Sequence, residues 1–203
     1  MRHLPIPILG LLFASACQQQ QPSQSPAATI PASARRIAAE KPSWNARLLL
    51  AAKTGDDAGT REALRHGASP NARGFYDMSP LLWAVSQHHY TTATLLLDRG
   101  ANPNQPKKDR VTPICIATQN GDLPLTTLLV ERGADVNRPD ERGQTPLLWV
   151  AFYGHLPVAG YLVQHGAHVN TVDRFGQTPL SMAQGQHRDE MISFLITHGA
   201  TKP

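Results

Sequence analysis

Histidines form the side-chain pairs in this sequence that most suggest metal binding. His88 adjoins His89, and His165 lies three residues before His168. A zinc site needs three or four ligands drawn from cysteine, histidine and carboxylate side chains. Neither pair is joined by a cysteine or carboxylate at ligand spacing. We therefore expect no metal and no cofactor, and histidines such as His165 suit the carbonyl end of a helix instead.

Covalent catalysis has equally little support in the sequence. Cys115 lies in an apolar segment and has no catalytic partner, which favours a buried and unreactive thiol. Nucleophile motifs, glycine-rich phosphate loops and paired catalytic carboxylates are absent from the sequence. The chain is therefore predicted not to be an enzyme.

The N-terminus has the pattern of an export signal. Arg2 and His3 precede a short apolar run from Leu4 to Phe13, and the small residues Ala14 to Ala16 precede Cys17. The apolar run is about half the roughly 20 residues that a membrane span needs, so a permanent transmembrane helix is the weaker interpretation. We predict a signal peptide at residues 1–16.

Cys17 resembles the lipidated first residue of a mature bacterial lipoprotein. The sequence departs from that family at Ala14, where leucine is usual, and an ordinary signal peptidase cutting at the same bond would leave Cys17 as a free thiol. By the sorting habit of such lipoproteins, Gln18 after the cysteine implies the outer membrane, facing the periplasm. Residues 17–43 are rich in Gln, Pro and Ala and are predicted to form a disordered tether.

A 33-residue repeat runs through the rest of the sequence. Gly-Ala pairs begin at Gly67, Gly100, Gly133, Gly166 and Gly199. The same step separates Asn71, Asn104, Asn137 and Asn170, and it separates the segments that begin Ser79-Pro80, Thr112-Pro113, Thr145-Pro146 and Thr178-Pro179. Three independent markers in one register indicate an array of equivalent structural units.

These motifs resemble the ankyrin repeat, a 33-residue unit with a Thr-Pro-Leu-His start and a late Gly-Ala. The resemblance covers residues 44–203 and implies an all-α solenoid of five repeats, each a helix-turn-helix unit with a projecting hairpin loop. The repeats are expected at about 44–74, 75–107, 108–140, 141–173 and 174–203, the first acting as an N-terminal cap. The family histidine is replaced by Leu49, Leu82, Cys115, Leu148 and Ser181, so these turns are expected to depend more on apolar packing.

Local chemistry predicts the same helices. Serine or threonine before proline supplies an N-cap hydroxyl, and proline fits the first helical position, where no N–H is needed. Glycine after a run such as Leu128 to Arg132 closes the second helix in the left-handed conformation. Gly143 and Gly176 are expected to turn their hairpins. A single unit has no way to bury its apolar face, so the stacked repeats must share one core.

In the ankyrin family, the hairpin tips and the exposed side of the first helices form a concave binding face. The resemblance assigns seven aromatic residues and two arginines to this face: Phe75, Tyr76, Trp83, Trp149, Phe152, Tyr153 and Phe175, with Arg142 and Arg174. Tyr, Trp and Arg are enriched among the residues that dominate binding energy at interfaces. Trp83 and Trp149 would serve equally well in packing between first helices. Phe152 and Tyr153 fall where the family tolerates any residue, so they are the preferred contact residues.

The sequence therefore predicts a non-enzymatic scaffold of the bacterial envelope that docks one protein partner on the concave face. Two other versions stay open. In one version the chain is an immunity or inhibitor protein against an envelope-targeted toxin. In the other it is an accessory factor for an envelope stress-defence enzyme, like some exported ankyrin proteins that it resembles. The net charge of +4 is dispersed along the chain, which disfavours nucleic acid as a partner. We expect a monomer when free, with a membrane contact only through the lipid on Cys17. The signal peptide and tether argue against an effector sent into a host cell.

Overall fold

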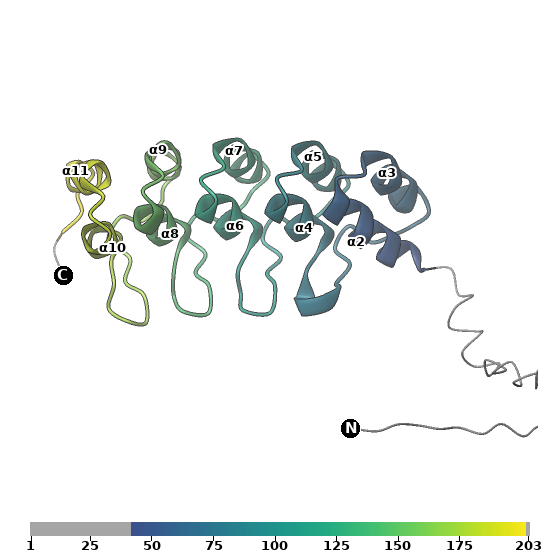
Figure 1. The fold of residues 1–203 in the computed structure, drawn as a ribbon, viewed down its shortest axis with the longest axis horizontal. Coiled ribbons are helices and arrows are strands. Elements are labelled where there is room, and N and C mark those ends of the chain that lie inside the picture. The colour runs from purple at the N-terminus through teal and green to yellow at the C-terminus, as the bar shows by residue number, and fades with distance from the viewer. Residues whose placement is uncertain (1–41, 202–203) are drawn as a thin grey trace, which may run out of the picture. The chain divides into compact units, whose positions relative to one another are not determined.

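The computed structural model describes residues 42–201, so the predicted signal peptide and nearly all of the predicted tether lie outside the described residues. Within residues 42–201 the chain forms ten α-helices in two rows (Figure 1). The inner helices, next to the projecting loops, are α2 (Trp44–Thr54), α4 (Pro80–Ser86), α6 (Pro113–Gln119), α8 (Pro146–Tyr153) and α10 (Pro179–Gly185). The outer helices are α3 (Asp57–Arg65), α5 (Tyr90–Asp98), α7 (Leu123–Glu131), α9 (Leu156–Gln164) and α11 (Asp189–Thr197). The predicted all-α repeat array is thereby confirmed.

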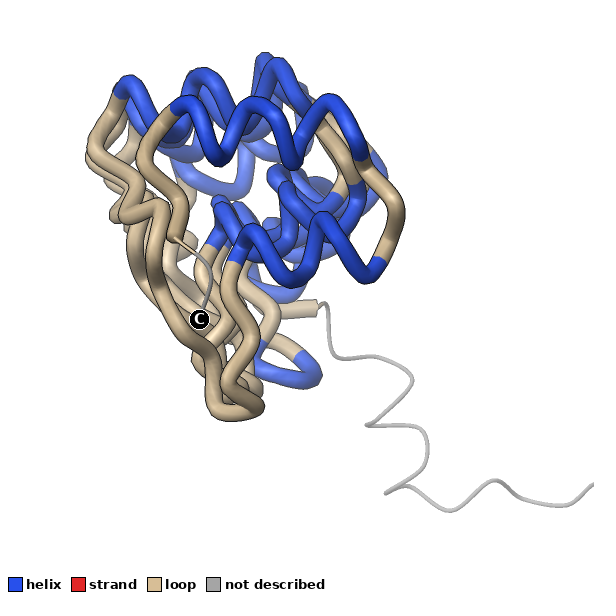
Figure 2. Tube along the Cα trace, turned by 90° about the vertical axis from the view of Figure 1, so that its left-hand side faces the viewer, coloured by secondary structure: helices blue, strands red, loops and turns tan. Residues whose placement is uncertain are grey.

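The loops extend past the inner helices along one side of the array (Figure 2). A short 3₁₀ helix, η1 (Phe75–Asp77), lies in the first of these loops. None of the helices within residues 42–201 has the length and apolar character needed to span a bilayer.

Four inner helices begin at proline, as predicted: Pro80, Pro113, Pro146 and Pro179. The Ser79 hydroxyl accepts a hydrogen bond from the Leu82 N–H at 3.2 Å. Thr178 accepts from the Ser181 N–H at 3.1 Å while the Ser181 hydroxyl accepts from the Thr178 N–H at 2.8 Å, which forms a reciprocal capping box. These two caps satisfy N–H groups that would otherwise lack a partner.

The prediction of a capping hydroxyl is wrong for the other two of these helices, α6 and α8. Thr112 Oγ1 donates to Cys115 Sγ at 3.2 Å, and Thr145 Oγ1 lies 3.3 Å from Thr171 Oγ1. Neither hydroxyl accepts a helix N–H. Another polar side chain competes for each hydroxyl, so these helices start on the preset φ of proline without a side-chain cap.

The outer helices end in the predicted glycines. At the end of α7, the Gly133 N–H donates to the Val130 carbonyl at 3.0 Å and the Ala134 N–H donates to the Leu129 carbonyl at 2.9 Å. This pair of bonds is the Schellman motif, which requires a left-handed residue. Gly133 supplies it with a φ of 86°, so the 33-residue Gly-Ala marker is explained by helix termination.

The second marker, asparagine, joins consecutive repeats. Asn137 Nδ2 donates to the Gly166 carbonyl at 2.9 Å, and Asn137 Oδ1 accepts from the His168 N–H at 2.8 Å. Equivalent pairs of bonds are made by Asn71, Asn104 and Asn170. Each asparagine therefore satisfies a backbone donor and acceptor in the next unit, and the four together form an asparagine ladder along the array.

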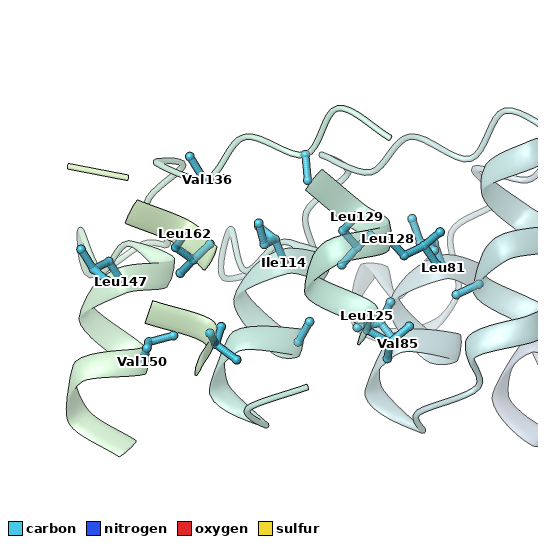
Figure 3. Close-up of a cluster of buried hydrophobic side chains, with 14 of the residues drawn as sticks. Leu81, Val85, Ile114, Leu125, Leu128, Leu129, Val136, Leu147, Val150 and Leu162 are labelled. Atoms are coloured by element: carbon cyan, nitrogen blue, oxygen red, sulfur yellow. The ribbon is translucent and has the colours of Figure 1, made fainter. Parts of the chain in front are cut away.

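Aliphatic side chains from both helix rows form one continuous core (Figure 3). Its residues include Leu81, Val85, Ile114, Leu125, Leu128, Leu129, Val136, Leu147, Val150 and Leu162. Leu82 and Leu148, which replace the family histidine, are fully buried as well. Each buried leucine contributes roughly 1.5–3 kcal/mol of hydrophobic stabilisation, so the predicted reliance on apolar packing is confirmed at these two positions.

Two histidines also connect neighbouring repeats at the turn between inner and outer helices. His155 Nε2 lies 3.1 Å from the Gln119 carbonyl oxygen, and His89 Nε2 lies 3.2 Å from the Lys53 carbonyl oxygen. The His155 ring lies directly against Gly121: a Cβ added to this glycine would stand only 2.6 Å from His155 Nδ1. Gly121 is therefore required both for its φ of 68° and for the room that it leaves to the ring.

We expect Gly121→Ala to destabilise the domain more than Gly133→Ala. Both glycines have positive φ, so both substitutions introduce left-handed strain of roughly 1–2 kcal/mol. A Cβ at Gly133 meets no atom within 4 Å, whereas at Gly121 it meets the His155 ring, which must move away from Gln119. The Gly121 variant should lose about 1–2 kcal/mol more of its free energy of unfolding in urea denaturation. Equal losses in the two variants would contradict the structural role given to the His155 contact.

Candidate protein-binding surface

Hairpin loops form one edge of the candidate surface, at residues 73–78, 106–111, 139–144 and 172–177. Each loop is closed by a backbone hydrogen bond, for example from the Asp140 N–H to the Gln144 carbonyl at 3.0 Å. Neighbouring tips are joined by bonds from the Lys108 N–H to the Tyr76 carbonyl (3.4 Å), from Glu141 to Asp109 (3.1 Å) and from Arg174 to Arg142 (3.0 Å). The four loops are therefore one connected structure, the hairpin row, seen along the lower edge of Figure 1.

Buried aspartates hold two of the tips in place. Asp140 Oδ1 accepts from the Arg142 N–H at 2.8 Å and from the Gln144 N–H at 2.9 Å. Asp173 makes the corresponding pair of bonds one repeat later. Hydrogen bonds of this kind, from N–H to a carboxylate, are about twice as strong as neutral ones. The side chains that these tips carry are therefore presented on a preordered backbone.

The first tip has an unusual backbone. Tyr76 and Asp77 both have a φ of 57°, in the left-handed region that non-glycine residues seldom occupy. Asp77 shares this conformation with Arg110, Gly143 and Gly176 at the same repeat position, so Tyr76 is the residue that departs from the other hairpins. Such residues cost of order 1 kcal/mol each and concentrate at functional sites. The turn leaves the Phe75 and Tyr76 side chains 90% and 82% exposed. Two large aromatic groups thus stand in water at a position where the backbone is strained to hold them.

A hollow of about 660 Å³ lies beside this tip, and we call it the aliphatic hollow. Its walls come from α2, α4 and the first hairpin: Ala46, Leu49, Leu50, Lys53, Gly74, Phe75 and Trp83. Lys53 Nζ stands 4.8 Å from the centroid of the Trp83 ring, within cation–π range. The hollow therefore combines apolar walls with one cation at its edge.

A second hollow, of about 620 Å³, is lined by the second, third and fourth hairpins and by α6 and α8. We call it the central hollow. Ile116, Trp149 and Phe175 supply apolar wall. The charged side chains of the lining are three cations and three carboxylates: Lys107, Arg142, Arg174, Asp109, Asp140 and Glu141. This arrangement suits a ligand side chain that is partly apolar and partly acidic or polar.

A third hollow, of about 270 Å³, adjoins the central one and shares Arg142 and Trp149 with it. Phe152 and Gln144 lie in its wall. Trp149 Nε1 and Gln144 Oε1 are buried and have no hydrogen-bond partner in the described part of the chain. Unpaired buried polar atoms cost free energy, so these two groups are held in the wall at some cost to stability.

The sequence-predicted contact residues divide between the hollows. Phe75 and Trp83 line the aliphatic hollow, while Trp149, Arg142, Arg174 and Phe175 line the central one. Tyr76 adjoins Lys107 and Lys108 in a smaller depression, and Phe152 lines the third hollow while packing against the core. Tyr153 lines none of them, and its contact role stays a prediction. Its ring centroid lies 5.1 Å from that of Phe152 and 6.2 Å from that of Trp149.

Sequence reasoning missed the contribution of the first repeat. Leu49, Leu50 and Lys53 of α2 line the aliphatic hollow, and Leu50 is 63% exposed. The repeat register places these residues in the N-terminal capping repeat, for which we predicted a role in covering the core and not in binding a partner. The signal that could have revealed them is the run Leu48-Leu49-Leu50, which has one leucine more than the buried side of a helix can cover.

The histidines that suggested metal binding are used in other ways. His88 Nδ1 lies 2.7 Å from Asp122 Oδ2, and His165 Nδ1 lies 2.8 Å from the Tyr161 carbonyl oxygen. The latter is the predicted contact with a helix-end carbonyl. Within residues 42–201, no three His, Cys, Asp or Glu side chains gather closely enough to hold a metal ion.

Cys115 is a buried thiol in α6, as predicted, with no measurable exposure. Burial raises its pKa above the ordinary value; the Thr112 hydrogen bond opposes this shift, and the charges of Asp140 and Asp109 add to it. Because the thiolate is the nucleophilic form, a raised pKa and a closed environment make this side chain unreactive.

Comparison with known proteins agrees with the architecture. The family model described as "Ankyrin repeats (3 copies)" matches residues 114–203, and the model described as "Ankyrin repeat" matches residues 76–108. No curated protein matches the sequence. Together the two matched ranges span more than half of the chain and include four of the inner helices. This chain therefore belongs to the ankyrin-repeat family.

Proposed function

We propose that this chain is a non-enzymatic scaffold of the bacterial envelope that docks one protein partner on the hairpin row and the inner helices. Ankyrin-repeat proteins are in general binding scaffolds without enzymatic activity. One observation carries the docking surface: Phe75, Tyr76 and Phe175 are 90%, 82% and 69% exposed on tips joined by backbone hydrogen bonds. Rigid aromatic groups remove much area from water and lose little entropy on binding.

The envelope location rests on the export pattern that ends at Cys17. We place the chain in the periplasm, tethered to the outer membrane through a lipid on this cysteine. A full-length chain with a C-terminal tag should sediment with the outer membrane when cells are fractionated. Cys17→Ala should move it to the soluble periplasmic fraction, because the lipid attachment site is lost. A cytoplasmic location of both forms would refute the proposed compartment.

Affinity capture tests the docking surface. The full-length tagged chain serves as bait in an envelope extract, beside a Phe75→Ala/Phe175→Ala variant. The matched control is Tyr90→Ala/Ile196→Ala, because these side chains are also exposed, at 49% and 54%, but lie on outer helices. We expect one protein to be retained by the wild type and by the control and to be lost with the hairpin variant.

Mass spectrometry of the retained protein then identifies the partner. Equal retention by all three baits would show that the partner binds elsewhere on the chain. Retention by none of them would count against an envelope partner altogether. Melting curves of both variants establish that each is folded, so that a lost partner is not explained by unfolding.

A further inference from the structure

Charge is distributed unevenly between the two sides of the array. Residues 42–201 contain equal numbers of basic and acidic side chains. The inner helices hold no aspartate or glutamate, and their charged residues are Arg47 and Lys53 of α2. Apart from α3, which carries both signs, the outer helices hold only acidic charges: Asp98, Glu131, Asp189 and Glu190. Basic and acidic residues are therefore equal in number but differ in which side of the array they occupy.

Most carboxylates of the hairpin row are already engaged. Asp140 and Asp173 are buried and accept backbone N–H groups. Asp77 lies 3.7 Å from Arg73, and Asp109 pairs with Lys107. Partial burial pushes the pKa of Asp109 upward, but the hydrogen bond and charge of Lys107, together with backbone hydrogen bonds, outweigh it, so the net pKa lies below the ordinary value. Asp109 is therefore a charged partner of Lys107 at neutral pH.

Cations are left over on the same row. Lys108, Arg110, Arg142 and Arg174 are exposed, and none of them forms an ion pair within residues 42–201. Glu141 is the one hairpin carboxylate of the described residues that neither an ion pair nor a backbone bond engages. The backbone bonds between tips fix the spacing of these cations, and Arg142 and Arg174 line the central hollow beside Trp149. Three carboxylates line it too, but Asp109 pairs with Lys107 and Asp140 accepts backbone N–H groups, so Glu141 alone is left to oppose the two arginines. Fixed cations beside an aromatic wall form a site for a carboxylate attached to an apolar segment.

We propose that the partner docks through an acidic segment of its chain, with carboxylates opposite Lys108, Arg142 and Arg174 and an apolar side chain against Trp149. This inference rests on the proposed docking function and adds the chemistry of the partner. Arginine binds a carboxylate through two parallel hydrogen bonds, so Arg142 and Arg174 also fix the orientation of the segment. The acidic outer helices face away from this row (Figure 2) and do not compete for its cations.

A protein segment fits the row better than a nucleic acid or a lipid surface. In the 33-residue register, Glu141 occupies the position between Lys108 and Arg174, so a continuous phosphate backbone would meet a negative charge in the middle of its track. A protein segment places its carboxylates individually and leaves that position neutral or basic. The hollows between the cations also accept side chains, whereas a phosphate surface offers nothing to fill them.

Peptide selection tests this inference before the partner is identified. The purified full-length chain is used to select from a phage-displayed library of random dodecapeptides. We expect the selected peptides to be enriched in Asp and Glu together with an aromatic residue or leucine. Their Kd should rise at least about tenfold in a Lys108→Gln/Arg142→Gln/Arg174→Gln variant and should also rise with added salt.

A matched variant removes the same charge from the other side of the array. Arg61→Gln/Arg65→Gln/Arg99→Gln neutralises three exposed arginines on or next to the outer helices, and it should leave the Kd within about twofold. Circular dichroism of both triple variants checks that they are folded. An equal rise in Kd in the two variants would mean a nonspecific charge effect, which overturns the proposed site.

The remaining outcomes separate this inference from the docking proposal. Selected peptides without acidic enrichment that lose binding in Phe75→Ala/Phe175→Ala would overturn the acidic segment and leave docking on this face intact. Peptides that bind all variants equally would overturn both. Tighter binding of phosphatidylglycerol vesicles or of a duplex DNA oligonucleotide, lost in the Lys108 triple variant, would replace the protein segment by a lipid or a nucleic acid.

Discussion

Leu129→Ala is expected to lower the free energy of unfolding by about 3–5 kcal/mol. Leu129 lies in α7, at the middle of the array, and its side chain is fully buried in the shared core. Repeats on both sides contact this part of the core (Figure 3), so the vacated space has little freedom to collapse. Domains of this kind are stable by about 5–15 kcal/mol, so the loss is a large fraction of the total.

Urea denaturation followed by circular dichroism measures this effect. Leu50→Ala makes the same chemical change at a leucine that is 63% exposed. It should change the free energy of unfolding by no more than about 0.5 kcal/mol. Similar losses in the two variants would contradict the burial on which the prediction depends. A lower urea slope in Leu129→Ala would mean that the repeats no longer unfold together, because the central interface couples the two halves of the array.

Trp149→Ala is expected to weaken binding of the captured partner by about 2 kcal/mol or more, which is roughly thirtyfold in Kd. Trp149 lines both the central hollow and the third hollow, so its removal alters the wall of each. Its Nε1 atom has no partner among the described residues, so Trp149→Phe breaks no hydrogen bond within that part of the chain. We expect Trp149→Phe to weaken binding less than Trp149→Ala does, because phenylalanine keeps part of the aromatic wall.

Isothermal titration of the partner against each variant measures these affinities. Trp44→Ala is the control, because it removes the same side chain from the first repeat, where Trp44 stacks on His66 at 4.1 Å and lines neither of the hollows shared by Trp149. Its affinity should match that of the wild type. A folded Trp149→Ala variant with unchanged affinity would remove the central hollow from the docking site.

The helices were predictable because their signals are local. Proline after Ser79 or Thr178 and glycine after α7 act on the backbone within a few residues, whatever surrounds them. The capping role of Thr112 and Thr145 was not predictable in the same way. Whether a hydroxyl bonds a helix N–H or another side chain depends on Cys115 in one case and on Thr171, from the next hairpin, in the other. The contact with Thr171, 26 residues further along the chain, forms only when the array has folded, whereas Cys115 lies three residues from Thr112 and competes for its hydroxyl locally.

The candidate surface was predictable as a set of positions but not as a shape. The resemblance assigns Phe75, Trp149 and Phe175 to one face; in the structure Phe75 lines the aliphatic hollow and the other two line the central hollow. The left-handed φ of Asp77 follows from the register, because Gly143 and Gly176 hold the same position in later repeats, but that of Tyr76 has no such sequence signal. Tyr153 follows Phe152 by one residue, and one step around a helix turns a side chain by about 100°, so Tyr153 points away from the third hollow that Phe152 lines.

The asparagine ladder also determines how the array responds to force. Each rung joins one repeat to the next through two short hydrogen bonds, and the rungs are nearly identical along the chain. Tension along the array therefore meets a series of similar weak links and not one strong joint. Each 33-residue unit that detaches releases about 110 Å of extended chain. Under tension we therefore expect the array to lengthen in steps of one repeat.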